Sequence, residues 1–84
     1  MIRLLKVIWF RAMLNHSLNC ESAYSRAAAE FRAAARLALL EGRNPAPLQV
    51  SAALYHRLVL TEQDLQRAYR AELIGLGARA EMLV

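Results

Sequence analysis

The chain has few residues that interrupt or cross-link a backbone: one cysteine, two prolines and three glycines in 84 residues. A single cysteine, Cys20, cannot form an internal disulfide, so the sequence favours a reducing compartment such as the cytoplasm. No apolar run approaches the ~20 residues that a membrane-spanning helix needs. The chain also lacks a glycine-rich phosphate loop, paired carboxylates and a Ser-His-Asp set, so we predict no catalytic residues, no metal site and no cofactor.

Acidic residues are scarce, and lysine is nearly absent. Eleven Lys and Arg stand against seven Asp and Glu, which gives a formal net charge of +4, and Lys6 is the only lysine. No acidic residue precedes Glu21. A basic balance suits nucleic acid or an anionic membrane surface, although a composition rich in Arg and Ala also follows from a GC-rich genome.

The strongest helical pattern runs from Cys20 to Gly42. Alanine is the best helix former, and the stretch contains no proline and no internal glycine. Small and aromatic side chains recur at alternating spacings of four and three, which places them on one helix face. We call this face the seam; it comprises Cys20, Tyr24, Ala27, Phe31, Ala34 and Ala38. The seam predicts a close helix–helix interface, within one chain or between two copies. Gly42 is expected to end the helix in the left-handed conformation.

Residues 2–16 form a second amphipathic pattern, in which Leu5, Ile8, Trp9 and Ala12 share an apolar face. The simplest interpretation is a packing helix whose apolar face is buried. A cap at Asn19, or alternatively at Ser17, would separate it from the next helix, while one continuous helix through both segments is the alternative.

The cations Arg3, Lys6 and Arg11 lie away from that apolar face. They form a candidate anion or membrane face, because interfacial helices combine basic side chains with Trp and aliphatic residues. An Arg-rich segment without acids is also typical of a targeting peptide.

The second half of the chain begins with a proline linker at residues 43–47. A helix is expected over about residues 48–59, with Leu48, Ala52, Tyr55 and Val59 forming its buried stripe. Thr61 then resembles an N-cap: Asp64 stands at the capping-box position, and Leu60 and Leu65 are placed as a hydrophobic staple. The fourth helix should cover about residues 62–74. Residues 75–84 either continue it or form a short fifth helix, and their apolar end, Met82-Leu83-Val84, should dock on the core or on another subunit.

A tight turn between these two helices would form a degenerate helix-turn-helix. Its candidate nucleic-acid face is Gln63, Gln66, Arg67 and Arg70, whose side chains suit adenine and guanine edges. His16 and Cys20 share a helix face if the first two helices are continuous. However, two ligands do not make a zinc site, since zinc takes three or four.

Together these patterns predict one all-α domain over residues 1–84. We expect a small four-helix bundle of two helical hairpins joined by the proline linker. The expected function is a small non-enzymatic helical interaction or assembly module, which self-associates or binds a protein partner. A nucleic-acid-binding regulator is the first alternative, and peripheral association with an anionic membrane surface through the N-terminal helix is the second.

Overall fold

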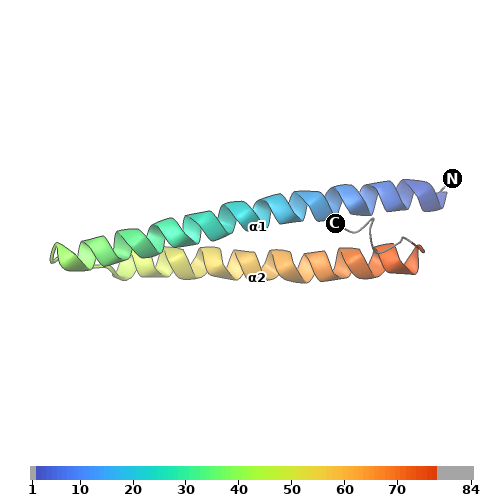
Figure 1. The fold of residues 1–84 in the computed structure, drawn as a ribbon. Helices are drawn as coiled ribbons and strands as arrows, with labels where there is room; N and C mark the ends of the chain where they lie inside the picture. The colour runs from blue at the N-terminus through green and yellow to red at the C-terminus, as the bar shows by residue number, and fades with distance from the viewer. Residues whose placement is uncertain (1, 78–84) are drawn as a thin grey trace.

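The computed structural model describes residues 2–77 and contains two long helices. Helix α1 spans Ile2–Leu40 and α2 spans Ala46–Gly75. They run antiparallel and lie side by side, so that α1 starts at the end where α2 finishes, and the longer α1 extends past α2 at the loop end (Figure 1). The molecule is therefore a rod, with principal extents of 61 × 16 × 15 Å.

The two helices contact each other through a regular repeat of inward-facing positions. In each helix, the residues that face the partner recur at alternating spacings of three and four, which is the heptad pattern of a coiled coil. All of these positions are buried or half-buried. They are Val7, Phe10, Leu14, Ser17, Glu21, Tyr24, Ala28, Phe31, Ala35 and Ala38 on α1, and Leu48, Ala52, Tyr55, Val59, Glu62, Gln66, Tyr69 and Leu73 on α2, with Leu76 directly after its end.

The prediction of a four-helix bundle was wrong, whereas the all-α character is confirmed. The segments predicted as two helices belong to one helix, α1, which runs through residues 2–40, and neither Ser17 nor Asn19 caps a helix start. Helix propagation continues through these weaker formers because no glycine or proline stops it before Gly42. The heptad positions also continue without a break, so packing on α2 supports one continuous helix.

The predicted turn before residue 62 is also absent. Thr61 lies inside α2, where its Oγ1 donates to the carbonyl oxygen of Arg57, 3.1 Å away and one turn back. A hydroxyl that bonds the preceding turn is the usual arrangement for Thr within a helix. The capping box and the staple are therefore not formed, and the two halves of α2 do not make a helix-turn-helix.

The stop at Gly42 is confirmed. Gly42 has φ +74°, and the backbone N–H of Arg43 donates to the carbonyl of Ala38, 2.8 Å away. This is the Schellman arrangement, in which a left-handed glycine closes the last helical turn. The linker then contributes a second local bond, since Asn44 Oδ1 accepts from the N–H of Ala46 at 3.1 Å and Pro45 leads into α2.

The kinds of side chain that form the helix–helix contact change along the rod. Near the start of α1, Val7 and Leu14 pack on Leu73, with Phe10 and Tyr69 beside them. The centre is polar. Beyond it, Tyr55 contacts Tyr24 and stacks on Phe31, with ring centroids 6.2 and 5.5 Å apart. Towards the loop the contact is made by small side chains, namely Ala28, Ala35, Ala38 and Ala52.

The stripe predicted for residues 48–59 does face α1, and Ala52 is its most buried member. At the opposite end, Arg3 Nε donates to the carbonyl oxygen of Leu76, 2.6 Å away, and ties the start of α1 to the end of α2. The predicted docking of Met82-Leu83-Val84, and the alternatives for residues 78–84, lie outside the described residues.

Candidate interaction surfaces

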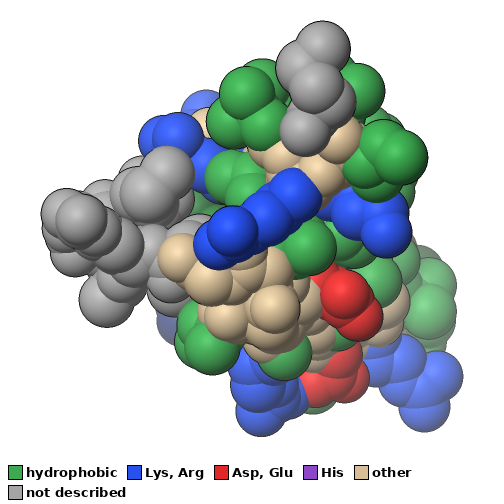
Figure 2. Space-filling model, turned by 90° about the vertical axis from the view of Figure 1, so that its right-hand side faces the viewer, with side chains coloured by type: hydrophobic (Ala, Val, Ile, Leu, Met, Phe, Trp, Pro, Cys, Tyr) green, Lys and Arg blue, Asp and Glu red, His purple; other side chains and the backbone are tan. Residues whose placement is uncertain are grey.

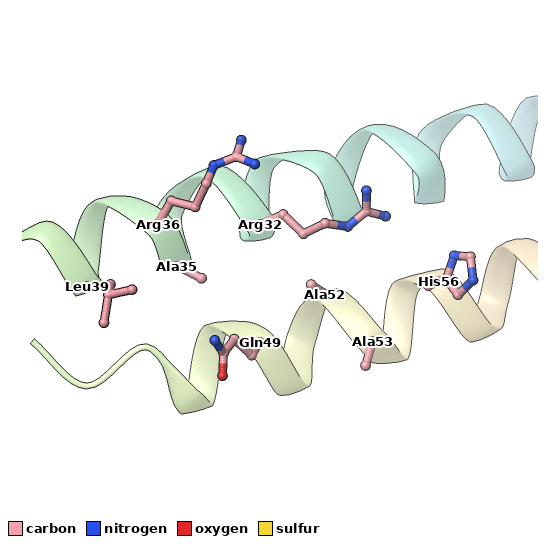
Figure 3. A pocket seen from close by; sticks show the side chains of 8 residues that line it. All are labelled: Arg32, Ala35, Arg36, Leu39, Gln49, Ala52, Ala53 and His56. Atoms are coloured by element: carbon pink, nitrogen blue, oxygen red, sulfur yellow. The ribbon is translucent and has the colours of Figure 1, made fainter.

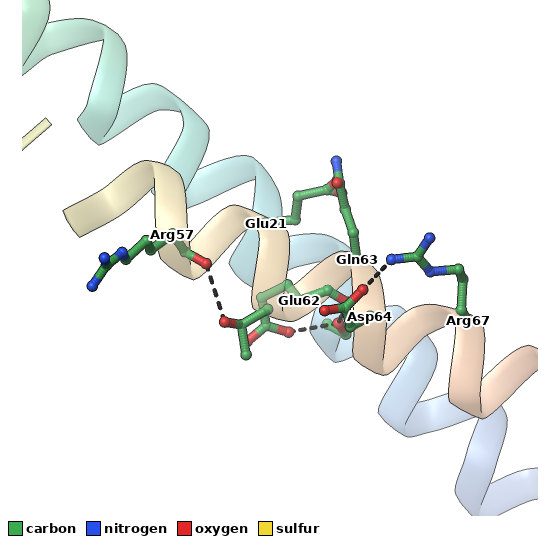
Figure 4. Close-up of polar contacts among 8 residues, drawn as sticks. Glu21, Arg57, Glu62, Gln63, Asp64 and Arg67 are labelled. Carbon is green, nitrogen blue, oxygen red and sulfur yellow. Dashed lines mark hydrogen bonds and ion pairs between the residues drawn. The ribbon is translucent and has the colours of Figure 1, made fainter. Parts of the chain in front are cut away.

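A polar belt crosses the middle of the hairpin. Ser17 Oγ donates to the carboxylate of Glu62, and the amides of Gln63 and Gln66 each donate to Glu21 at 3.2 Å. Figure 4 shows Glu21 of α1 beside Gln63 of α2, with Glu62 one residue away. Ser17 and Gln66 are buried, with Gln66 only 4% exposed. No buried side-chain nitrogen or oxygen within residues 2–77 lacks a hydrogen-bond partner. The belt is therefore a satisfied network, and it fixes which levels of the two helices face each other.

This belt includes half of the candidate nucleic-acid face. Gln63 and Gln66 are engaged with Glu21, and Arg67 pairs with Asp64 one turn away on α2. Arg70 is half-buried. In this fold the four residues lie along one uninterrupted helix, and Gln66 is enclosed between the helices. The arrangement does not present a recognition helix with free base-reading side chains.

The seam is divided between two environments. Tyr24, Phe31 and Ala38 face α2, whereas Cys20, Ala27 and Ala34 lie beside the helix–helix contact and are half-buried. The periodicity thus identified the correct side of the helix but was displaced from the centre of the contact. The central positions that it missed, Ala28 and Ala35, are small residues inside an alanine-rich run, where several registers fit equally well.

The displaced half of the seam belongs to one long side of the hairpin, which we call the apolar edge. Its members are Met13, Cys20, Ala27 and Ala34 of α1 together with Leu54, Leu58 and Leu65 of α2. The three leucines are partly exposed, Leu58 by 41%. None of the nine arginines among residues 2–77 lies on this edge or at the outward positions beside it, such as Ala23 and Thr61.

The opposite long side carries basic and polar groups. There, an open groove of about 640 Å³ lies between the helices near the loop. Ala35 and Ala52 point towards each other between the helices, and their small size leaves the hollow, while Arg36 extends away from it (Figure 3). Arg32, Gln49 and His56 complete the rim. A second groove on this side lies beside the polar belt, between Ser25 and Gln63.

A separate apolar surface covers the first three turns of α1, which we call the N-terminal patch: Ile2, Leu5, Ile8, Trp9 and Ala12. The prediction that Leu5, Ile8 and Trp9 are buried was wrong, since they are 66%, 57% and 56% exposed. The other side of the same turns, Val7 and Phe10, packs on α2 instead. Figure 2 shows hydrophobic side chains next to Lys and Arg side chains at this end of the rod.

His16 and Cys20 do lie on one face, because α1 is continuous. Cys20 Sγ and His16 Nε2 are 3.5 Å apart. Within residues 2–77, no third His, Cys, Asp or Glu stands close enough to complete a metal-binding group. The pair is therefore a local contact between successive turns of α1.

No protein-family model, no curated protein and no solved structure matches this chain. Within the described part of the chain, neither helix has the combination of length and hydropathy that a membrane span requires. The surfaces themselves are thus the basis for a functional proposal.

Proposed function

We propose that this chain is a non-enzymatic helical module that associates with a second copy of itself through the apolar edge. The row of partly exposed leucines on that edge, Leu54, Leu58 and Leu65, is the observation that carries the proposal. Nine arginines occur among residues 2–77, and all of them lie elsewhere. A contiguous apolar surface that is exposed on a single chain marks an interaction site, because burying it against a partner removes that surface from water.

The shapes of the two helices on this edge support a symmetric pairing. Leu54 and Leu58 flank Tyr55, and Cys20 and Ala27 flank Tyr24, whose ring is 6.2 Å from that of Tyr55. Protruding leucines of α2 and small residues of α1 therefore lie at the same level of the rod. If α2 of one copy packs on α1 of the other, the leucines of each copy contact the small residues of its partner. Each such contact then occurs twice, as a twofold interface requires.

The accessible surface supports the same conclusion. A compact chain of 9.5 kDa is expected to expose about 5,000 Å². The whole chain exposes 6142 Å². The excess, about 1,000 Å², is comparable with the roughly 800 Å² that each partner contributes to a standard interface. Pairing along the apolar edge would thus bring the chain to ordinary compactness.

A cytoplasmic location is part of this proposal. Cys20 lies on the apolar edge and is the only cysteine of the chain. A reducing compartment keeps its thiol free, so that association rests on packing rather than on a cross-link between copies.

The test is the mass in solution, measured by light scattering over a range of protein concentrations, for the wild type and for Leu58→Glu. Leu60→Glu is the matched control, since Leu60 is two residues away on α2, has a similar exposure (47%) and points away from the apolar edge. We expect a dimer or larger species for the wild type and the control, and a monomer for Leu58→Glu.

Two results would overturn the proposal. One is a wild-type monomer at the highest concentration reached. The other is equal association of the two glutamate variants, which would assign the contact to a different surface. Circular dichroism of each variant verifies that the helices remain intact in the comparison.

A further inference from the structure

We propose that the N-terminal patch docks the hairpin on an anionic lipid bilayer, with the first three turns of α1 lying in the plane of the interface. This surface is distinct from the apolar edge, and the inference does not depend on self-association. It rests on the position of the patch, on the charges around it and on the dimensions of the exposed apolar side.

The patch is exposed because α1 is apolar on two sides over the same three turns. Val7, Phe10 and Leu14 pack on α2, so the opposite side chains, including Leu5 and Ile8, have no partner within the described chain. Trp9 lies at the margin of the patch, with its ring edge against Phe10 at a centroid distance of 5.0 Å. Trp at the border of an apolar surface is typical of a protein that contacts the lipid headgroup region.

Cations flank the patch on both sides. Lys6 lies on one flank and Arg11 on the other, and both are exposed. The nearest acid on α1 is Glu21, and the acid nearest in space on α2 is Glu72. Basic side chains beside an inserted apolar face add attraction to anionic lipids, as in interfacial amphipathic helices.

The dimensions fit a helix that lies on a bilayer. From Ile2 to Ala12 the patch is about 15 Å long at 1.5 Å per residue. Insertion of such a side reaches about 5–10 Å, to the boundary between headgroups and acyl chains.

Charge complementarity favours a bilayer over the other occupants. A second copy docked through the same patch would bring together four cations, Lys6 and Arg11 of each chain, against one nearby acid of each chain, Glu72. Nucleic acid offers phosphates to the cations but no apolar surface for Ile2, Leu5 and Ile8. An anionic bilayer supplies both.

The experiment uses the full chain and two kinds of vesicle: phosphatidylcholine alone, and phosphatidylcholine mixed with phosphatidylglycerol. Flotation measures binding, and the fluorescence of Trp9, the only tryptophan, reports where binding occurs. We expect co-flotation with the anionic vesicles and a blue shift of the Trp9 emission. Neutralising Lys6 and Arg11 together, as Lys6→Gln with Arg11→Gln, should weaken binding on the order of 30-fold, at roughly fivefold for each basic residue lost.

Ile8→Ser is the variant for the apolar side, and Val50→Ser is its matched control. Both residues are exposed to a similar extent, 57% and 60%, but Val50 lies on α2 near the loop. We expect Ile8→Ser to lose binding to the anionic vesicles and Val50→Ser to keep it.

Absence of binding to the anionic vesicles would overturn the proposal, as would binding that leaves the Trp9 emission unchanged. A blue shift that appears without vesicles as the protein concentration rises would assign the patch to a second copy instead. A shift induced by duplex DNA but not by vesicles would assign the cations to nucleic acid.

Discussion

Ser17 donates a hydrogen bond from Oγ to the side-chain carboxylate of Glu62, 2.5 Å away, across the centre of the two-helix contact. The same oxygen lies 3.2 Å from the backbone carbonyl of Glu62. Ser17, which the sequence offers as an alternative helix cap, is thus buried inside α1 and joins α1 to α2. This pair and its polar neighbours interrupt an otherwise apolar contact. Removing the serine hydroxyl should therefore change the free energy of unfolding in a defined direction.

Ser17→Ala should destabilise the hairpin, because it leaves the half-buried Glu62 carboxylate without its donor. We expect a loss of roughly 1–3 kcal/mol in the free energy of unfolding, measured by urea denaturation followed by circular dichroism. Replacing both partners, as Ser17→Ala with Glu62→Leu, should recover most of that loss. Ser25→Ala, at an exposed position of the same helix, is the control and should change little; an equal loss there would remove the special role of the Ser17 contact.

The effect of Thr61→Ala on stability distinguishes a threonine at a helix start from one inside a helix. At an N-cap the substitution would cost about 1 kcal/mol. Inside α2 it should instead stabilise the helix by a few tenths of a kcal/mol, roughly, because Ala has the higher helix propensity. Thermal unfolding followed by circular dichroism gives the sign, and a clear decrease in melting temperature would contradict the continuous helix.

Two glycines provide a matched pair for the turn. Gly42 has a left-handed backbone with φ +74°, while Gly75 is helical, and an added Cβ would meet nothing within 4 Å at either position. Gly42→Ala should therefore cost about 1–2 kcal/mol from backbone strain alone. Gly75→Ala should be neutral or stabilise by up to about 1 kcal/mol. Chemical denaturation of both variants tests the turn, and two equal effects would argue against the left-handed stop.

Tyr55 connects the two aromatic contacts in the loop-side half of the rod. Tyr55→Leu keeps most of the apolar volume but removes the ring that stacks on Phe31 and contacts Tyr24. We expect a loss of about 1–3 kcal/mol, since each aromatic pair contributes about 0.5–1.5 kcal/mol beyond its buried area. The tyrosine contribution to near-ultraviolet circular dichroism should decrease in parallel, while Tyr24 and Tyr69 remain. An unchanged stability would show that the rings around Tyr55 pack loosely.

Much of the helical content could be predicted from local signals. The Schellman stop at Gly42, the proline linker and the buried stripe from Leu48 to Val59 follow from backbone chemistry and helical periodicity. The helix boundaries at Asn19 and Thr61 were wrong, because capping residues indicate where a helix can start and not that it must. Without a glycine or proline nearby, cooperative propagation and packing on the other helix decide.

The candidate surfaces were predicted only in part. The seam was found from its spacing, but an alanine-rich run fits several registers, and only contact with α2 shows that Tyr24 and Phe31 are inside while Cys20 and Ala27 lie at the edge. The exclusion of arginine from that edge depends on both helices at once. It becomes visible only when the side of α1 and the side of α2 are known to coincide.

The sequence by itself determined that the chain is helical and that a helix ends at Gly42 before the proline linker. It also predicted breaks near Asn19 and Thr61, which are absent from the structure. The tertiary structure decided that there are two helices and which apolar residues remain outside. The physical reason is that, in a pair of helices, each helix can bury only the one face that contacts its partner. In α1 that stripe is taken by Val7, Phe10 and Leu14, so Leu5, Ile8 and Trp9 remain exposed on the opposite side.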